Sequence, residues 1–485
     1  MLWCALYLPD LPLQVFTRGR SESAPLAVLD GHPRRRIVAA DPAAMACGVE
    51  PGLGRASALA IAPELCLVDR APSLEHAALI DIASWAGRFT PAVSLDPPNT
   101  VLLEVEACLR LFGGLAPLGR QITRQIEELG FHARLAFAQT ALAARWLARF
   151  GTGDDVGKPL AERLDRLPLR ALAEGTPVGS DNLDLLTGTG HATLGEVRRL
   201  PRHGLARRHA QAVTDAIDRA YGHVPDPRSW FSPPERYLSR LPLPTPSGQA
   251  DTLLFATRRL LAGLAGWLDA RQAGVERFTL VLEFERNSQV PETSVEIVLG
   301  VLSRDMVRCQ LLAREHLNRL PLPAAVDALR LAADLPCPLA PSAGELFEGD
   351  DEHRGDAGLL VATLRARLGD QAVRCLTPHP DHRPEKAWRW IEPPVPGPVH
   401  TRSTPIPLPP SPRPLWLLPE PRAIPAPQPW SLLAGPERIE SGWWDGPEAT
   451  VGRDYFVART QDGCLAWVFR ERGAPHGWYL HGYFA

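Results

Sequence analysis

Short apolar segments alternate with amphipathic stretches through residues 1–150, and this alternation restricts the fold more than any other feature. The predicted strands are residues 26–29, 37–40, 101–105 and 133–138, and residues 2–16 read as an opening strand segment. The predicted helices, with apolar residues at helical spacing, are residues 74–89, 115–129 and 140–150. Strands that alternate with helices indicate an α/β domain.

The composition is that of a soluble globular protein with several domains, because 45% of the 485 residues are hydrophobic. Eight cysteines occur without a C-x-x-C pair, so no zinc site, disulfide framework or cofactor is predicted. No apolar run approaches the roughly 20 residues that span a bilayer, and no leader is evident, so we expect a cytoplasmic protein. The net charge is only -3, so any nucleic-acid binding must depend on local basic patches.

The rest of the chain changes character several times. Residues 164–221 read as short helices broken by Gly, Pro and Asn, which predicts a small helical domain. A proline-rich link then precedes a β-α-β-β-α-β-like unit, with predicted helices at 251–270 and 305–320 and strands at 278–285, 294–299 and 325–333. After a possible helix at 359–368, a proline-rich tether leads to an aromatic-rich end that predicts a small β-rich module.

Two segments resemble the fingers and palm of Y-family translesion DNA polymerases: Ala-Asp-Pro-Ala-Ala-Met-Ala-Cys-Gly-Val at 40–49 and Ala-Pro-Glu-Leu-Cys at 62–66. The order of predicted elements agrees with that family through the strand-helix unit. The resemblance implies an α/β multidomain protein with palm and fingers (1–160), a helix-hairpin-helix thumb (161–230), a little finger (231–336), a clamp- and partner-binding region (337–392), a proline-rich tether (393–437) and an aromatic module (438–485).

Four further motifs resemble a catalytically degenerate branch of this family. They are Leu-Pro-Asp-Leu-Pro-Leu-Gln-Val-Phe at 8–16, Leu-Arg-Leu-Phe-Gly-Gly at 109–114, Ile-Glu-Ser-Gly-Trp-Trp at 439–444 and Trp-Val-Phe-Arg-Glu-Arg at 467–472. Active members hold two metal ions with an Asp on the first strand and an Asp-Glu pair before a later strand. This chain has Tyr7 and Pro9 at the first place and, aligned without gaps, Asn99 and Thr100 at the second.

The alternative is a rearranged metal site in an active polymerase, formed by Asp10, Asp96 and Glu104. The prolines that follow Asp96 make a shift of register conceivable. In the structural interpretation, Asp10 is a turn former, Asp96 is a turn or cap residue before prolines, and Glu104 is an outward-facing strand residue. We predict the structural interpretation, and therefore neither metal nor catalysis.

The side chains that contact the incoming nucleotide in active relatives are also missing from this chain. Where active relatives carry a Tyr and an Arg that contact the triphosphate, this chain has Pro42 and Met45, and neither can donate a charged hydrogen bond to phosphate. Lys158 is a possible remnant of a phosphate-binding lysine, although a solvated loop lysine explains it equally well.

Arginines cluster in the predicted thumb, around Pro and Gly turns. They are Arg198, Arg199, Arg202, Arg207 and Arg208. Such a cluster suits contact with the phosphates of DNA, which positions a duplex without reading its bases. The alternative is a solvated charged helix face. Individually weaker candidates are Arg34, Arg35, Arg36, Arg304 and Arg308.

The segment at 343–347 resembles the sliding-clamp-binding peptides of translesion polymerases, with Leu346 and Phe347 as apolar anchors. Ala343 stands where those peptides carry Gln, and a local packing role is the alternative. His379 and His382 lie in a segment that reads as a rigid recognition loop rather than a metal site.

The resemblance also implies partners: DNA, the sliding clamp, an error-prone C-family DNA polymerase and a RecA-like accessory protein, at a nucleoid-associated location in the cytoplasm. The leading hypothesis is a non-catalytic, polymerase-like adaptor in translesion synthesis and damage-induced mutagenesis. The second is an active Y-family polymerase, and the third is a DNA-binding structural protein without mutagenic partners.

Overall fold

The structure is a computed structural model. It describes residues 1–485 except 20–23, 32–34, 154–156, 208–210, 286–287, 335, 340–349, 394–411, 426–429, 474–475 and 485. The chain forms two compact units, Met1–Arg367 and Leu368–Ala485. Each is described by itself.

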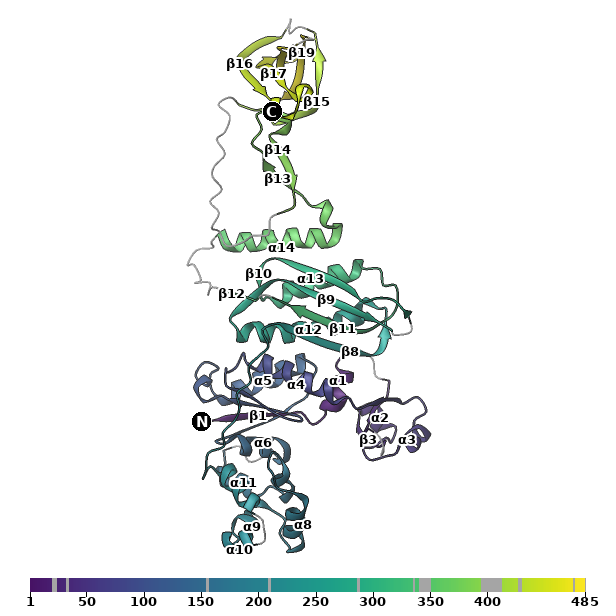
Figure 1. Cartoon of the computed structure of the whole chain (residues 1–485), viewed down its shortest axis with the longest axis vertical. Coiled ribbons are helices and arrows are strands. Elements are labelled where there is room, and N and C mark those ends of the chain that lie inside the picture. The colour runs from purple at the N-terminus through teal and green to yellow at the C-terminus, as the bar shows by residue number, and fades with distance from the viewer. Residues whose placement is uncertain are drawn as a thin grey trace. The chain divides into compact units, whose positions relative to one another are not determined.

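An antiparallel four-stranded sheet, with strand order β5-β6-β1-β7, forms the centre of the first unit. Its strands are β1 (Trp3–Tyr7), β5 (Val93–Asp96), β6 (Thr100–Glu104) and β7 (Arg134–Ala138). Leu6 and Leu103 on one face are buried beneath α4 (Pro72–Ala86) and α5 (Leu115–Glu128). Trp3 and Ala5 on the other face are buried beneath α6 (Ala141–Phe150), and Figure 1 shows these helices on opposite sides of β1.

The opening segment is a strand only as far as Tyr7. Pro12 is at the second position of helix α1 (Leu11–Thr17), where its missing N–H costs no hydrogen bond. A separate three-stranded sheet, order β3-β2-β4, follows and carries two short helices. Its elements are β2 (Leu26–Leu29), β3 (Ile37–Ala40), α2 (Pro42–Ala46), α3 (Arg55–Ile61) and β4 (Cys66–Asp69).

The predicted helical domain packs on α6 and shares one apolar core with it, which includes Trp146, Leu194 and Ile217. Its elements are α7 (Leu160–Asp165), η2 (Leu169–Ala173), α8 (Ser180–Gly188), α9 (Leu194–Arg198), α10 (Arg202–Arg207) and α11 (Gln211–Tyr221). Helix α9 begins with a capping box, in which Thr193 and Glu196 bind each other's backbone N–H groups.

The linker after α11 lies against the central sheet. Asp226 accepts a hydrogen bond from the Leu142 backbone N–H, and the Trp230 ring stacks on Trp3 at 5.7 Å. The Phe231 N–H donates to the Val93 carbonyl on β5 at 2.7 Å. These contacts fix the link between the helical domain and the next sheet.

The second half of this unit has the predicted order of strands and helices. It comprises β8 (Tyr237–Ser247), α12 (Ala250–Ala270), β9 (Ala273–Phe284), β10 (Thr293–Ser303), α13 (Met306–Arg319), β11 (Val326–Ala333), the short β12 (Cys337–Pro338) and α14 (Asp350–Leu368). The main strand order is β10-β9-β11-β8. Helix α12 packs closely on α4, because a Cβ at Gly266 would lie 2.8 Å from the Cα of Trp85.

The second unit contains a hairpin, β13 (Cys375–Pro378) and β14 (Trp388–Ile391), and an antiparallel five-stranded sheet. The sheet, in the order β15-β19-β18-β17-β16, consists of β15 (Trp416–Ile424), β16 (Ser431–Ser441), β17 (Val451–Arg459), β18 (Leu465–Glu471) and β19 (Trp478–Tyr483). Tyr455, Trp467 and Phe469 form its core. The β-rich module is therefore larger than 438–485, because β15 and the start of β16 lie within the range predicted as tether.

Candidate active-site remnant and nucleic-acid interface

The residues that the sequence predicts at degenerate metal positions meet at one end of the central sheet. Tyr7 is paired with Thr100 across β1 and β6, and the Leu8 N–H donates to the Asn99 carbonyl at 2.9 Å. Pro9 follows directly, and Thr100 is buried. The structure thus brings Tyr7, Pro9, Asn99 and Thr100 together, and none of them carries a carboxylate.

Asp96 lies beside this end of the sheet, opposite Thr100 in the β5–β6 hairpin. Its carboxylate contacts the Arg145 guanidinium, which is 4% exposed, and lies 3.7 Å from Arg228 Nη1. Arg145 in turn lies 3.6 Å from the Glu174 carboxylate. Asp96 is therefore paired with two cations of the protein itself, and these also pair with other carboxylates, Arg145 with Glu174 and Arg228 with Asp226.

Of the other two carboxylates of the rearranged-site hypothesis, Glu104 lies at the other end of β6, and Asp10, which directly follows Pro9, lies 3.8 Å from His132 Nδ1. Glu104 is paired with Trp3, four residues along β6 from Thr100, which corresponds to about 13 Å along a strand. It accepts hydrogen bonds from the backbone N–H groups of Leu2 and Glu106. Asp10 precedes α1. Asp10, Asp96 and Glu104 do not form one cluster, and the described residues contain no group of three or more potential metal ligands.

An arginine covers the aromatic residue at the first metal position. The Arg149 guanidinium lies 5.3 Å from the centre of the Tyr7 ring, and its Nη1 lies 2.9 Å from the Glu174 carboxylate. Arg145, Arg149 and Arg228 therefore pair with the carboxylates near this end of the sheet, whereas a phosphoryl-transfer enzyme needs acidic side chains that are available to metal ions.

The two residues predicted at nucleotide-contacting positions lie in α2, and neither is positively charged. Pro42 and Met45 belong to this five-residue helix, Met45 is half exposed, and Asp41 caps the helix by accepting from the Ala44 N–H. Lys158 lies in an exposed turn before α7.

Three of the predicted thumb arginines are brought together with two aspartates. Arg198 donates to both oxygens of Asp165, at 3.0 and 2.8 Å, and Arg199 lies 3.8 Å from the same carboxylate. Arg202 donates to both oxygens of Asp218, at 2.8 and 2.5 Å. Burial raises the pKa of Asp165, but hydrogen bonds from Arg198 and Tyr221 outweigh it and hold the pKa below the ordinary value.

For the other predicted DNA- and clamp-binding residues, the structure describes few contacts or none. The side chain of Arg207 in α10 is not described, and Arg208, Leu346 and Phe347 lie outside the described residues, as does Arg34. Arg304 lies 3.4 Å from Asp269, and Arg308 belongs to α13.

The segment around His379 and His382 packs on the C-terminal sheet through a residue that the sequence did not single out. Arg383 is 2% exposed and donates to Asp381 and Asp445, and its guanidinium lies 5.7 Å from the Trp444 ring. Glu385 accepts from Arg453 at 3.0 Å. Nothing in the sequence marks Arg383, because its partner Asp445 lies 62 residues away.

The five-stranded sheet also contains a buried imidazole. The His481 side chain is buried, and its Nδ1 lies 2.8 Å from the Tyr455 hydroxyl. Burial lowers the pKa of His481 to about 4, so the ring is neutral at pH 7.

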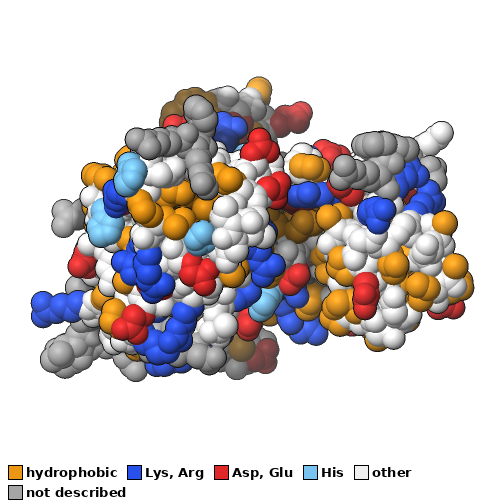
Figure 2. Space-filling model, turned by 90° about the horizontal axis from the view of Figure 1, so that it is seen from below, with side chains coloured by type: hydrophobic (Ala, Val, Ile, Leu, Met, Phe, Trp, Pro, Cys, Tyr) orange, Lys and Arg blue, Asp and Glu red, His pale blue; other side chains and the backbone are white. Residues whose placement is uncertain are grey.

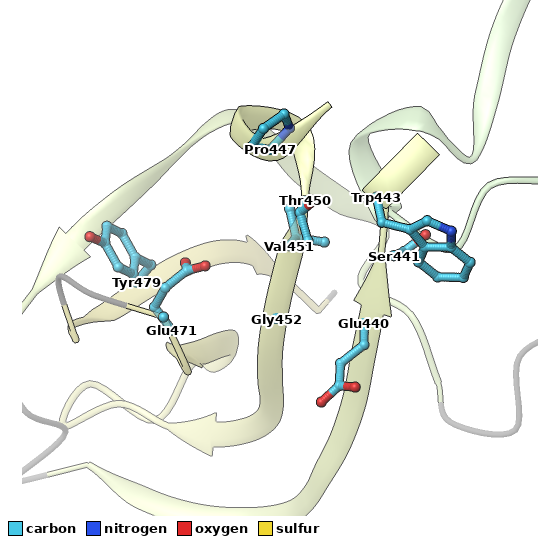
Figure 3. A pocket seen from close by; sticks show the side chains of 10 residues that line it. Glu440, Ser441, Trp443, Pro447, Thr450, Val451, Gly452, Glu471 and Tyr479 are labelled. Carbon is cyan, nitrogen blue, oxygen red and sulfur yellow. The ribbon is translucent and has the colours of Figure 1, made fainter. Parts of the chain in front are cut away.

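A cavity of about 720 Å³ opens at one end of this sheet. Gly452 lies between two pairs of lining residues, Glu440 and Trp443 on one side and Glu471 and Tyr479 on the other (Figure 3). Burial raises the pKa of Glu471. Five tryptophans among the described residues of this unit are 44–70% exposed: Trp388, Trp390, Trp416, Trp443 and Trp444. Exposed aromatic side chains of this kind are typical of protein-binding surfaces.

Comparisons with known proteins agree with the sequence motifs. Residues 14–149 match the model of the impB/mucB/samB family. Protein ImuB of Caulobacter vibrioides, from strain NA1000 / CB15N and from strain ATCC 19089 / CIP 103742 / CB 15, is 28% identical over 472 residues, which is 90% of this chain and 100% of the relative.

Solved structures of polymerases also align with the chain. A ternary complex of Dbh aligns with a TM-score of 0.37 and 16% identity over 69% of this chain and 99% of that one. DinB from Sulfolobus solfataricus aligns with a TM-score of 0.38 and 16% identity over 70% of this chain and 100% of that one.

Residues 14–149 are thus similar to the impB/mucB/samB family, in a chain with a mixed α/β, multidomain architecture and a C-terminal region of its own. More narrowly, it is ImuB-like, since its similarity to Protein ImuB extends over 90% of its length. No helix in the part of the chain that the structure describes is long and apolar enough to cross a membrane.

Proposed function

We propose that this protein is a non-catalytic, polymerase-like adaptor in translesion synthesis. Its likeness to ImuB supports a polymerase-like protein of damage-induced mutagenesis. The observation that carries the non-catalytic part is the state of Asp96, whose carboxylate is held by Arg145 and Arg228. A metal ion at this place would have to displace a buried guanidinium from Asp96, and the strand positions beside it, Tyr7, Asn99 and Thr100, offer no carboxylate.

Primer extension by the purified protein, with Mg²⁺ or Mn²⁺, tests this proposal. We expect no incorporation beyond that of a mock purification. Incorporation that Asp96→Asn or Asp10→Asn abolishes would overturn the proposal in favour of an active polymerase. Glu64→Gln, which changes a charge outside the central sheet, is the matched control.

DNA is the first proposed partner. Arg198, Arg199 and Arg202 gather on the helical domain, where side chains with several N–H donors suit phosphate oxygens. We expect salt-sensitive binding of primer-template DNA without sequence preference. Absence of binding at low salt would refute this part.

The sliding clamp is the second proposed partner, through Leu346 and Phe347. Apolar anchors of this kind dock into a groove and supply most of the binding energy. Substitution of both by Ala should abolish clamp binding and leave DNA binding unchanged. Substitution of Glu348 by Gln, one residue further on, is the control, and unchanged clamp binding by the double variant would remove the assignment.

The C-terminal unit is the proposed docking region for an error-prone C-family polymerase and for the RecA-like protein ImuA. Its exposed tryptophans, among them the adjacent Trp443 and Trp444, support a protein-binding role. A pull-down with full-length protein should lose at least one of these partners in the W443A/W444A variant. Exposed Leu111→Ala, in the other unit, serves as control. Loss of neither partner would favour a DNA-binding structural protein.

A further inference from the structure

The thumb arginine cluster, defined as Arg198, Arg199 and Arg202, is already occupied by carboxylates of the protein. Asp165 binds the first two arginines and Asp218 binds the third. In Figure 2, where the molecule is seen from below and this domain faces the viewer, acidic side chains lie among the basic ones. The cluster therefore carries less net positive charge than its arginines alone provide.

The geometry of the Arg202–Asp218 pair is that of arginine bound to a phosphate. Two N–H groups of one guanidinium meet two oxygens of one anion, at 2.8 and 2.5 Å. A DNA phosphate that uses the same donors must displace the carboxylate. The Arg202 side chain is 68% exposed, so a phosphate can reach it, whereas Asp218 is 14% exposed.

The two aspartates differ in what else they hold. Asp165 also accepts a hydrogen bond from the Tyr221 hydroxyl at 2.6 Å, and its side chain packs against Gly195. It is thus part of the packing between α7, α9 and α11. The Asp218 side chain, although mostly buried, is bound to Arg202, whose own side chain is largely exposed, and among the described contacts no second side chain and no glycine ties it to neighbouring helices, as they do for Asp165. The Arg202–Asp218 pair is the one that can exchange.

We propose that Asp218 is an internal competitor of DNA phosphate that keeps the affinity of the thumb for DNA low. This inference rests on the proposed DNA binding by the same arginines. When a phosphate replaces Asp218, the freed carboxylate attracts a cation from solution, which offsets one counterion released from DNA. The competitor therefore also makes DNA binding less dependent on salt.

The experiment measures the binding of a fluorescent primer-template duplex to the full-length protein by anisotropy, over a series of salt concentrations. Asp218→Asn should bind several-fold more tightly than wild type, with a salt slope steeper by about one. Asp215→Asn is the matched control, because Asp215 is an exposed residue of the same helix whose side chain accepts from Gln211. It removes the same charge without releasing an arginine.

The double variant R202Q/D218N isolates the pair, and it should lose the gain that D218N shows over D215N. Binding of DNA by the wild type supports the proposed function. Given that binding, the inference is overturned if D218N binds DNA no more tightly than D215N, or if R202Q/D218N keeps the gain in affinity. If neither wild type nor any variant binds DNA at low salt, the proposed function fails and this inference fails with it. Circular dichroism of each variant excludes unfolding as the cause.

Discussion

Replacing Arg145 by Met should destabilise the first unit strongly. The side chain is 4% exposed and contacts the carboxylates of both Asp96 and Glu174. Removing one member of a buried ion pair typically costs about 3–5 kcal/mol, because the partner stays buried without compensation. Here Asp96 keeps Arg228 at 3.7 Å and Glu174 keeps Arg149 at 2.9 Å. We therefore expect a loss of about 2–4 kcal/mol.

Hydrogen exchange measured by mass spectrometry is the suitable assay, because two compact units need not unfold together. Amides of β5 and β6 should exchange faster in R145M by the factor that corresponds to the lost free energy, and those of β17 and β18 should be unchanged. Arg149→Met, at a side chain 32% exposed, is the control and should cost less than about 1 kcal/mol. Equal protection of β5 and β6 in R145M and wild type would refute the assignment of Asp96 to a buried ion network.

Three further predictions follow from contacts in the two units. Gly266→Val should lower the free energy of unfolding of the first unit by about 1–3 kcal/mol, seen as a lower melting temperature, because the new Cβ meets the backbone of Trp85. Gly204→Ala is the control: its Cβ has open space around it, so the variant should be as stable as wild type or more stable. Since the pKa of His481 falls from 6.5 to about 4 on folding, the second unit should lose stability as the pH falls from about 6.5 toward 4, and His481→Gln should flatten this dependence in calorimetric scans. Arg383→Ala should increase hydrogen exchange in β13 and β14, because a two-stranded hairpin is only marginally stable without support, whereas exposed Arg389→Ala should have no such effect.

The sequence predicted the elements that depend on local patterns, and it failed where a residue's role depends on a distant partner. The strands around Leu6 and Leu103 follow from apolar segments, and the order of strands and helices between Tyr237 and Ala333 agrees with the prediction. The expected neighbourhood of Tyr7 and Thr100 is present as a strand pair. The partners of Asp96 are not marked in the sequence, because Arg228 lies far along the chain in a proline-rich linker.

The proline-rich region shows the limit of composition as a guide. A proline-rich segment samples extended conformations rather than packing, and on that ground 393–437 is predicted to be a tether. Yet β15 contains two prolines, Pro419 and Pro421, and it is accommodated because it lies at the end of the strand order, with a register shift between Leu417 and Arg422. An edge position and an irregular register are tertiary features that composition does not reveal.

The linker along the central sheet has a consequence for solubility. β5 is the outer strand of the order β5-β6-β1-β7, and outer strands expose backbone groups that can recruit a strand from another molecule. The Phe231 N–H donates to the Val93 carbonyl on β5, while the preceding Trp230 stacks on Trp3 of β1. One backbone group on the β5 edge is thus occupied by an irregular segment of the same chain and is not available to a strand of another molecule.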